Sequence, residues 1–183
     1  MVVLSSQPFN PHWQCPPFKL PSVDGRIYSL ADFKDNEALL VAFICNHCPY
    51  VKAIESRLIE LAKRYQKRGV ATIGICSNDP TNYPDDSKEA LLLRWQEKDY
   101  GFPYLIDENQ SVAKAFDAVC TPDLFLFDAK RELFYHGRLD DNWKEEHKVT
   151  RHDLSDAIED LLAGKKPPKD QISSMGCSIK WKK

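Results

Sequence analysis

Long apolar runs and a charged leader are both missing from this sequence. No apolar stretch approaches the length of a membrane span, and residues 1–10 lack the positive and apolar regions of a secretory signal. We therefore expect a cytoplasmic protein with no membrane partner. The sequence also has no large excess of charge of one sign, because its 25 lysines and arginines nearly balance its 27 aspartates and glutamates. Without a strong basic field, nucleic acid is not an expected partner.

Internal repeats, low-complexity segments and a dense cysteine framework are absent as well. A chain of 183 residues with 43% hydrophobic content suits one domain, 1–183, with a core of approximately 16–164. Six cysteines in a domain of this size do not resemble the disulfide scaffolds of small secreted chains. In a reducing compartment they indicate redox chemistry, metal binding or buried packing. They are Cys15, Cys45, Cys48, Cys76, Cys120 and Cys177.

Apolar patterns divide the chain into alternating strands and helices. Residues 39–44 and 70–76 are continuous apolar runs, which are typical of strands covered on both faces. From Pro49 to Tyr65 apolar residues recur with helical spacing, and Gly69 follows as a stop signal. The other predicted elements are a hairpin of 18–20 and 27–30 around Asp24-Gly25, a helix starting near 86–89, a strand at 104–106, a short helix around 112–116, strands at 123–127 and 133–136, and a helix at 154–162 that ends at Gly164.

This order of elements predicts an α/β fold. We expect a central mixed β-sheet flanked by helices on both faces, with an N-terminal β-hairpin and, after Gly164, an irregular C-terminal tail. Right-handed crossovers between parallel strands place the loops after Ile44 and Cys76 at the same edge of the sheet. Ligand-binding and catalytic groups collect at such an edge.

A pair of cysteines lies at that edge. Cys45-Asn46-His47-Cys48 fills the turn between the apolar run ending at Ile44 and the helical segment beginning at Pro49. The spacing brings the two sulfurs close enough for a disulfide, and the partial positive charge of a helix start favours thiolate over thiol. The sequence therefore indicates a redox protein.

Together these motifs resemble the thioredoxin-like superfamily, in particular its peroxiredoxin-like, AhpC/TSA redoxin branch with a CxxC motif. Residues 18–30 are similar to the N-terminal hairpin of redoxins, and residues 45–48 are similar to the family CxxC. Thr121-Pro122 resembles the loop whose proline is cis and packs against the active-site disulfide. The ending 176–181 resembles the C-terminus of a group of redoxin-like bacterial proteins.

The resemblance implies a thioredoxin fold and a thiol-disulfide oxidoreductase that needs no cofactor. Its substrates would be protein or small-molecule disulfides, and its reductant a thioredoxin-like protein or glutathione. Cys45 would be the nucleophile and Cys48 the resolving thiol. His47, as in the similar CPHC motif of DsbA-type oxidases, would stabilise the Cys45 thiolate and make the disulfide more oxidising. The supporting residues would be Asn46, His47, Pro49, Thr121 and Pro122.

The sequence departs from thioredoxins in one respect and leaves a second enzyme open. Residues 41–43, Val-Ala-Phe, stand where thioredoxins have a buried aspartate, so the usual proton acceptor is absent. The Cys48-Pro49 pair resembles the Cys-Pro of peroxiredoxins, which favours a thiol peroxidase with Cys48, or Cys45, as the peroxidatic residue. However, Cys45 replaces the threonine of that motif, and no arginine for binding peroxide can be assigned.

Metal handling is the third alternative. Cys45, His47 and Cys48 are potential ligands of zinc or copper, as in thioredoxin-fold copper carriers. Three neighbours in one tight turn cannot easily all face one ion, so no metal site is predicted. Cys120, beside Thr121-Pro122, and Cys177 are candidate additional redox thiols.

Overall fold

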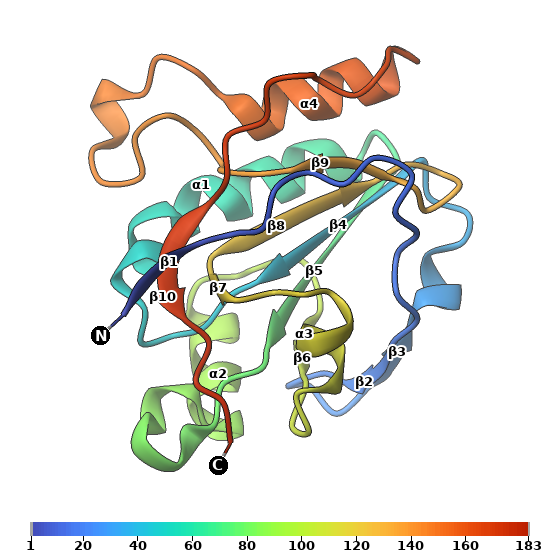
Figure 1. Ribbon diagram of the computed structural model, residues 1–183. Helices are drawn as coiled ribbons and strands as arrows, with labels where there is room; N and C mark the ends of the chain where they lie inside the picture. The colour runs from blue at the N-terminus through green and yellow to red at the C-terminus, as the bar shows by residue number, and fades with distance from the viewer. Residues whose placement is uncertain (1, 183) are drawn as a thin grey trace.

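The computed structural model describes residues 2–182. Its centre is a five-stranded mixed sheet with the strand order β6-β5-β4-β8-β9 (Figure 1). The strands β4, β5 and β6 run parallel to one another, whereas β8 is antiparallel to both β4 and β9. These strands are β4 (Ala38–Phe43), β5 (Val70–Cys76), β6 (Tyr104–Ile106), β8 (Asp123–Phe127) and β9 (Leu133–His136).

Helices cover both faces of this sheet. Helices α1 and α4 lie on one side, while α3 and the β2–β3 hairpin lie on the other (Figure 1). The helices are α1 (Pro49–Gln66), α2 (Lys88–Glu97), α3 (Ser111–Ala115) and α4 (Asp153–Leu162), with short 3-10 turns η1 (Leu30–Phe33), η2 (Pro80–Asn82), η3 (Pro84–Asp86) and η4 (Glu146–Lys148). The hairpin consists of β2 (Lys19–Pro21) and β3 (Ile27–Ser29).

Strand β4 shows why its sequence is a continuous apolar run. Every residue of the strand is buried. Leu40 belongs to the hydrophobic core on the α1 side, whereas Leu39 and Val41 belong to the core beneath α3 and the hairpin. Successive side chains of a strand point to opposite faces, so a strand covered on both faces must be apolar throughout.

Most of the predicted elements are confirmed. The mixed sheet, the helices on both faces and the N-terminal hairpin are present, and within residues 2–182 no helix is long and apolar enough to cross a membrane. Helix α1 begins at Pro49, whose missing N–H costs nothing in the first helical turn. Gly69 follows that helix with a φ of +84°, a conformation that glycine adopts without strain.

The register of the sheet gathers three connections at one edge. Phe43, the last residue of β4, pairs with Ile75 on one side and with Asp123 on the other. The turn after β4, the loop after β5 and the residues just before β8 therefore meet at this edge, which is where the sequence predicted catalytic groups.

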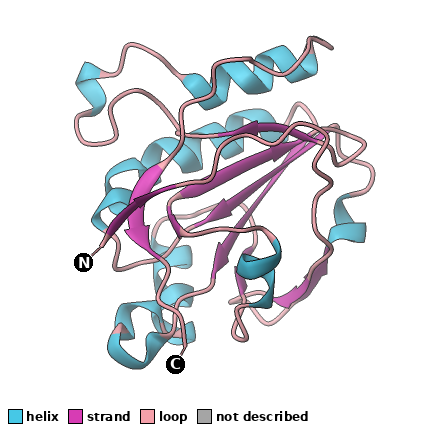
Figure 2. Cartoon of the chain, in the orientation of Figure 1, coloured by secondary structure: helices cyan, strands magenta, loops and turns pink. Residues whose placement is uncertain are grey.

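The prediction of an irregular C-terminal tail is wrong for its last part. Residues 165–174 form no helix or strand, but β10 (Met175–Ser178) pairs antiparallel with β1 (Val3–Ser5) and β7 (Cys120–Thr121) (Figures 1 and 2). Cys177 and Ile179 are buried in the two hydrophobic cores. This strand carries no apolar alternation, because it is held through its backbone by segments that are distant in the sequence.

Candidate active site

The CxxC turn joins the end of β4 to the start of α1. Cys48 is the residue that caps the N-terminus of α1, and Pro49 is the first residue of the helix. Both thiols are buried, with Cys45 1% and Cys48 0% exposed. No substrate reaches either sulfur without movement of the covering residues.

Thr121 contacts both sulfurs of the motif. Its hydroxyl lies 3.3 Å from Cys45 Sγ, and its carbonyl oxygen lies 3.1 Å from Cys48 Sγ. The bond between Thr121 and Pro122 is cis, which confirms the prediction made from the family loop. Cys48 has a further neighbour, because its Sγ lies 2.8 Å from the Sγ of Cys177 on β10. Three thiols and one threonine thus form a single buried cluster.

The two thiols of the motif have opposite acidities. A hydrogen bond from Cys45 lowers the pKa of Cys48 to about 5, although burial opposes ionisation, and a second hydrogen bond from Cys177 acts in the same direction. Burial raises the pKa of Cys45 well above its usual value, and its hydrogen bond to Cys48 and the charge of Asp86 raise it further. The Thr121 carbonyl favours the protonated form of Cys48, but the two thiol donors and the helix start outweigh it. Cys48 is therefore the more acidic thiol of the pair.

A buried carboxylate organises the turn. Asp86 Oδ1 accepts the backbone N–H groups of Asn46 at 2.8 Å and His47 at 3.1 Å. Its Oδ2 accepts Asn78 Nδ2 at 2.9 Å and His47 Nδ1 at 2.5 Å. Burial opposes the ionisation of Asp86, but the hydrogen bonds from His47 and Asn78 hold its pKa below the usual value. The carboxylate is therefore a fixed negative charge beside Cys45.

His47 is held between Asp86 and Tyr83. Its Nδ1 binds Asp86, and its ring stacks on Tyr83 with a centroid separation of 4.4 Å. The main causes of the raised Cys45 pKa are burial, the hydrogen bond to Cys48 and the charge of Asp86. The stabilisation of a Cys45 thiolate by His47 stays a prediction.

Asn46 contacts the turn's neighbours, whereas the two additional candidate thiols, Cys120 and Cys177, differ in how close they come to the CxxC pair. Asn46 fixes the turn, since its side-chain Nδ2 donates to the Ala90 carbonyl at 3.0 Å. Cys120 is adjacent to Thr121 in the sequence, but its Sγ contacts the Pro122 carbonyl at 3.7 Å, and burial raises its pKa. Of the two additional candidate thiols, only Cys177 contacts the CxxC pair.

Asp86 is the site residue that the sequence analysis missed. It lies in the loop after β5, at the edge where the loops after Ile44 and Cys76 were expected to meet. The predicted topology therefore indicated that residues of this loop would lie beside the CxxC turn. Together with Cys45 and His47, Asp86 forms the one group of potential metal ligands among residues 2–182, with ligand atoms within 4.8 Å of one another. Both oxygens of Asp86 already accept hydrogen bonds, one of them from His47 itself. The group is therefore a closed hydrogen-bonded cluster rather than an open set of ligands.

The family model for the AhpC/TSA family matches residues 12–136, more than half of the chain. The chain belongs to the AhpC/TSA family. No curated protein matches it. Two solved structures share this AhpC/TSA chain's fold closely. An uncharacterized conserved protein from Geobacillus kaustophilus is 44% identical, with a TM-score of 0.94, over 100% of this chain and 97% of its own. A hypothetical protein from Sinorhizobium meliloti 1021 is 43% identical, with a TM-score of 0.93, over 97% of this chain and 98% of its own.

A more distant structure identifies the fold of this AhpC/TSA member. The thioredoxin domain of a thiol-disulfide oxidoreductase from Bacteroides vulgatus is 18% identical, with a TM-score of 0.64. The match covers 85% of this chain and 99% of that domain. The fold is the thioredoxin fold, as the resemblance of the motifs implied.

Proposed function

We propose that this chain is a thiol-disulfide oxidoreductase whose Cys45 and Cys48 cycle between dithiol and disulfide. The observation that carries the proposal is the acidity of Cys48. Its sulfur lies at the start of α1, accepts a hydrogen bond from Cys45 and has a pKa of about 5, so it is ionised at neutral pH. A thiolate next to a second thiol is the arrangement that disulfide exchange requires.

In the first step the Cys48 thiolate attacks one sulfur of a substrate disulfide, R–S–S–R′. A bond forms between Cys48 Sγ and the sulfur of R, and R′S⁻ leaves and takes up a proton. Cys45 then gives up its proton and attacks Cys48 Sγ, which releases RS⁻ and forms the Cys45–Cys48 disulfide. The substrate gains two electrons and the protein loses two. A reducing thiol, such as glutathione or a thioredoxin-like dithiol, reverses the change in the protein.

The second step needs a proton acceptor, because Cys45 is the less acidic thiol. The aspartate that thioredoxins bury in the strand before the motif is replaced here by the apolar residues 41–43. Asp86 is a carboxylate from the neighbouring loop, and one of its oxygens lies within 4.8 Å of the Cys45 sulfur. We infer that the leaving thiolate RS⁻ takes up the proton that Cys45 loses, and that Asp86, held ionised by its four hydrogen bonds, fixes the turn that carries Cys45.

Exchange with glutathione disulfide and reduction of insulin test this proposal. We expect Cys48→Ser to abolish both reactions, and the double variant Cys45→Ser/Cys177→Ser, which keeps neither neighbouring thiol, to accumulate a mixed disulfide on Cys48 that mass spectrometry detects. Cys15→Ser is the matched control, since Cys15 is buried in the hydrophobic core on the other face of the sheet and burial raises its pKa. Full exchange activity in Cys48→Ser would overturn the proposal.

A thiol peroxidase remains the second candidate, because a small oxidant reaches a fully buried thiolate more readily than a folded protein does. Cys48 would attack hydrogen peroxide to give a sulfenic acid and water, and a neighbouring thiol would then form a disulfide and release a second water. None of the contributions to the Cys48 pKa comes from an arginine. We therefore expect slow peroxide turnover. Rapid turnover that survives Cys45→Ser and disappears in Cys48→Ser would favour the peroxidase.

A further inference from the structure

Strand β10 carries a third thiol into the site from 129 residues away in the sequence. Cys177 pairs with Thr121 of β7 on one side and with Val3 of β1 on the other. In Figure 1 this strand crosses beside the start of α1, and β10 and α1 are in contact. Cys177 is 0% exposed, so the strand both delivers its thiol to the cluster and covers it.

The sulfur of Cys48 lies between two potential partners. Cys45 donates a hydrogen bond to it from within the motif, and the Cys177 sulfur lies 2.8 Å away. Burial raises the pKa of Cys177 to about 12, and its hydrogen bond to Cys48 acts in the same direction. In the reduced protein the two sulfurs therefore lie within hydrogen-bonding distance, and Cys177 is the less acidic of the two thiols. The same contact places it where it can form a bond to Cys48 after oxidation.

The close approach of β10 to β7 is built into the sequence. A Cβ atom on Gly176 would lie 2.0 Å from the carbonyl oxygen of Thr121 and 2.6 Å from its carbonyl carbon. No residue with a side chain fits there without displacing the backbone. Glycine immediately before Cys177 thus allows the strand to lie against the residue that contacts both sulfurs of the CxxC motif.

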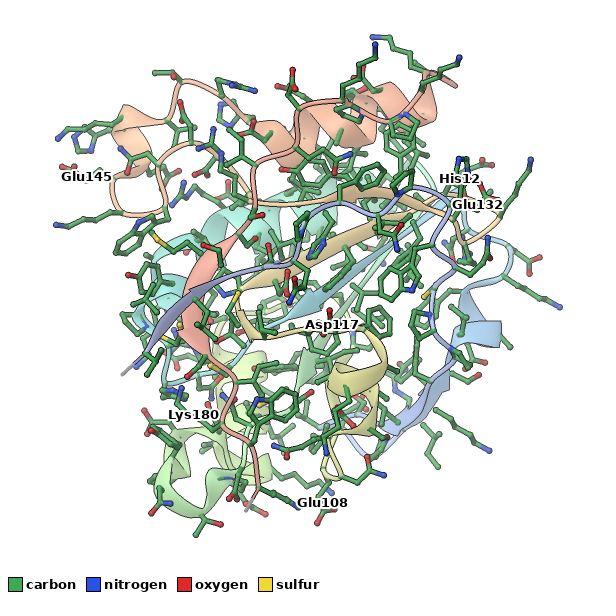
Figure 3. All side chains as sticks on the ribbon, in the orientation of Figure 1. His12, Glu108, Asp117, Glu132, Glu145 and Lys180 are labelled. Carbon is green, nitrogen blue, oxygen red and sulfur yellow. The ribbon has the colours of Figure 1, made fainter. Side chains whose placement is uncertain are left out.

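A second set of contacts anchors the segment beyond β10. Asn78 Oδ1 accepts the backbone N–H of Lys180 at 2.8 Å, and Asn78 Nδ2 donates to Asp86. The Lys180 carbonyl accepts hydrogen bonds from the Asp79 backbone and from Gln110 Nε2, both at 2.8 Å. Figure 3 labels Lys180 on the C-terminal ribbon beside the region of η2 and η3. The segment that carries Cys177 is therefore fixed to the same loop that supplies the carboxylate of the site.

We propose that Cys177 is a third redox thiol, which takes over the disulfide from the CxxC pair. The proposal rests on the proposed function of Cys45 and Cys48. Cys177 attacks Cys48 Sγ of the Cys45–Cys48 disulfide, so that a Cys48–Cys177 bond forms and the Cys45–Cys48 bond breaks. The proton lost by Cys177 passes to the Cys45 thiolate, and no electrons are gained or lost overall. Cys45 is thereby regenerated as a thiol while the oxidising equivalents are stored between α1 and β10.

Mapping of disulfides after oxidation with glutathione disulfide tests this proposal. The protein is quenched in acid, its free thiols are alkylated, and linked peptides are identified by mass spectrometry. We expect a Cys48–Cys177 linkage in the unmodified chain and in Cys45→Ser, and only a Cys45–Cys48 linkage in Cys177→Ser. Cys15→Ser is the matched control, because this thiol is buried in the hydrophobic core on the other face of the sheet, and it should give the linkages of the unmodified chain.

Gly176→Ala provides a test that keeps all three thiols. Displacement of β10 from β7 should cause loss of the Cys48–Cys177 linkage, retention of the Cys45–Cys48 linkage and faster alkylation of Cys48 in the reduced protein. The proposal is overturned if the unmodified chain and Gly176→Ala both contain only the Cys45–Cys48 linkage. Exchange with glutathione disulfide that is lost in Cys48→Ser, combined with that result, would leave the proposed function standing and reject the role of Cys177 alone. Exchange activity in Cys48→Ser would reject both.

Discussion

Two buried histidine–aspartate pairs in this molecule have the same chemistry and opposite surroundings. His47 and Asp86 lie at the active-site edge, where four hydrogen bonds reach the carboxylate. His136 and Asp123 lie inside the sheet, where His136 Nε2 is 2.7 Å from Asp123 Oδ1, and Asp123 Oδ2 has no hydrogen-bond partner. The number of donors, rather than the presence of a histidine, sets the charge of the carboxyl group.

The pKa values of the two aspartates reflect this difference. Burial opposes ionisation of both. The hydrogen bonds around Asp86 outweigh it and lower the pKa, whereas burial dominates at Asp123 and raises the pKa despite the hydrogen bond from His136. The ring of His136 also stacks on Phe125 with a centroid separation of 4.0 Å. The first pair is thus an electrostatic element of the site, and the second is part of the core.

Replacing each histidine by alanine should give the largest difference in stability between the two pairs. His136→Ala leaves Asp123 buried without its partner, and we expect the free energy of unfolding to fall by about 3–5 kcal/mol. His47→Ala leaves Asp86 with three donors, and a smaller loss of about 1–3 kcal/mol is expected. Urea unfolding of both variants measures the difference. Equal losses of free energy of unfolding in the two variants would contradict the view that the remaining donors of Asp86 compensate for the missing histidine.

Replacing each aspartate by asparagine should change the pKa of Cys45 only at the pair of Asp86 and His47. Asp86→Asn removes a charge that raises the pKa of Cys45, so that pKa should fall, and lost hydrogen bonds should reduce the free energy of unfolding by about 1.5–3 kcal/mol. The difference in thiolate absorbance between each variant and the same variant carrying Cys45→Ser measures the Cys45 pKa. Asp123→Asn is the matched control and should leave that pKa unchanged. A Cys45 pKa that is the same in both variants would contradict the electrostatic role of Asp86.

The pH dependence of stability should have opposite signs at the two pairs. The pKa of Asp86 is lowered by folding, so its contribution is present above the unfolded value of about 4 and is lost as the pH falls. The pKa of Asp123 is raised, so its contribution is present below about pH 4 and is lost as the pH rises. The free energy of unfolding of the unmodified chain relative to Asp86→Asn should therefore fall on acidification. The free energy of unfolding of the unmodified chain relative to Asp123→Asn should instead rise on acidification. Unfolding at a series of pH values checks this smallest effect.

Local patterns in the sequence predicted the regular elements because each one is largely decided by its own residues. Strand β4 is continuously apolar, and α1 has helical spacing between a proline and a glycine. The cysteine turn and the cis bond at Thr121-Pro122 followed from motifs with a fixed place in the fold. The helices and strands that local sequence patterns predicted, and the cis bond, were therefore confirmed.

The parts of the site that depend on distant contacts could not be read in this way. Strand β10 exists because Gly176 fits against Thr121, and no local pattern encodes that contact. The assignment of the thiolate depends on the residue that caps α1. Because the helix begins after Cys48, this cysteine rather than Cys45 benefits from the helix start and from both thiol donors. The partner of His47 could not be predicted, because Asp86 comes from another loop.

The position of β10 in the chain order has a consequence for biosynthesis. The ribosome completes β4, α1 and β7 before it makes β10, and at about 5–20 residues per second the 129 residues that separate Cys48 from Cys177 take about 6–26 s. During this interval the nascent chain contains both cysteines of the CxxC motif but not the strand that covers them. Until Cys177 is made, Cys48 can form a disulfide with its partner in the motif, Cys45, but not with the thiol of β10.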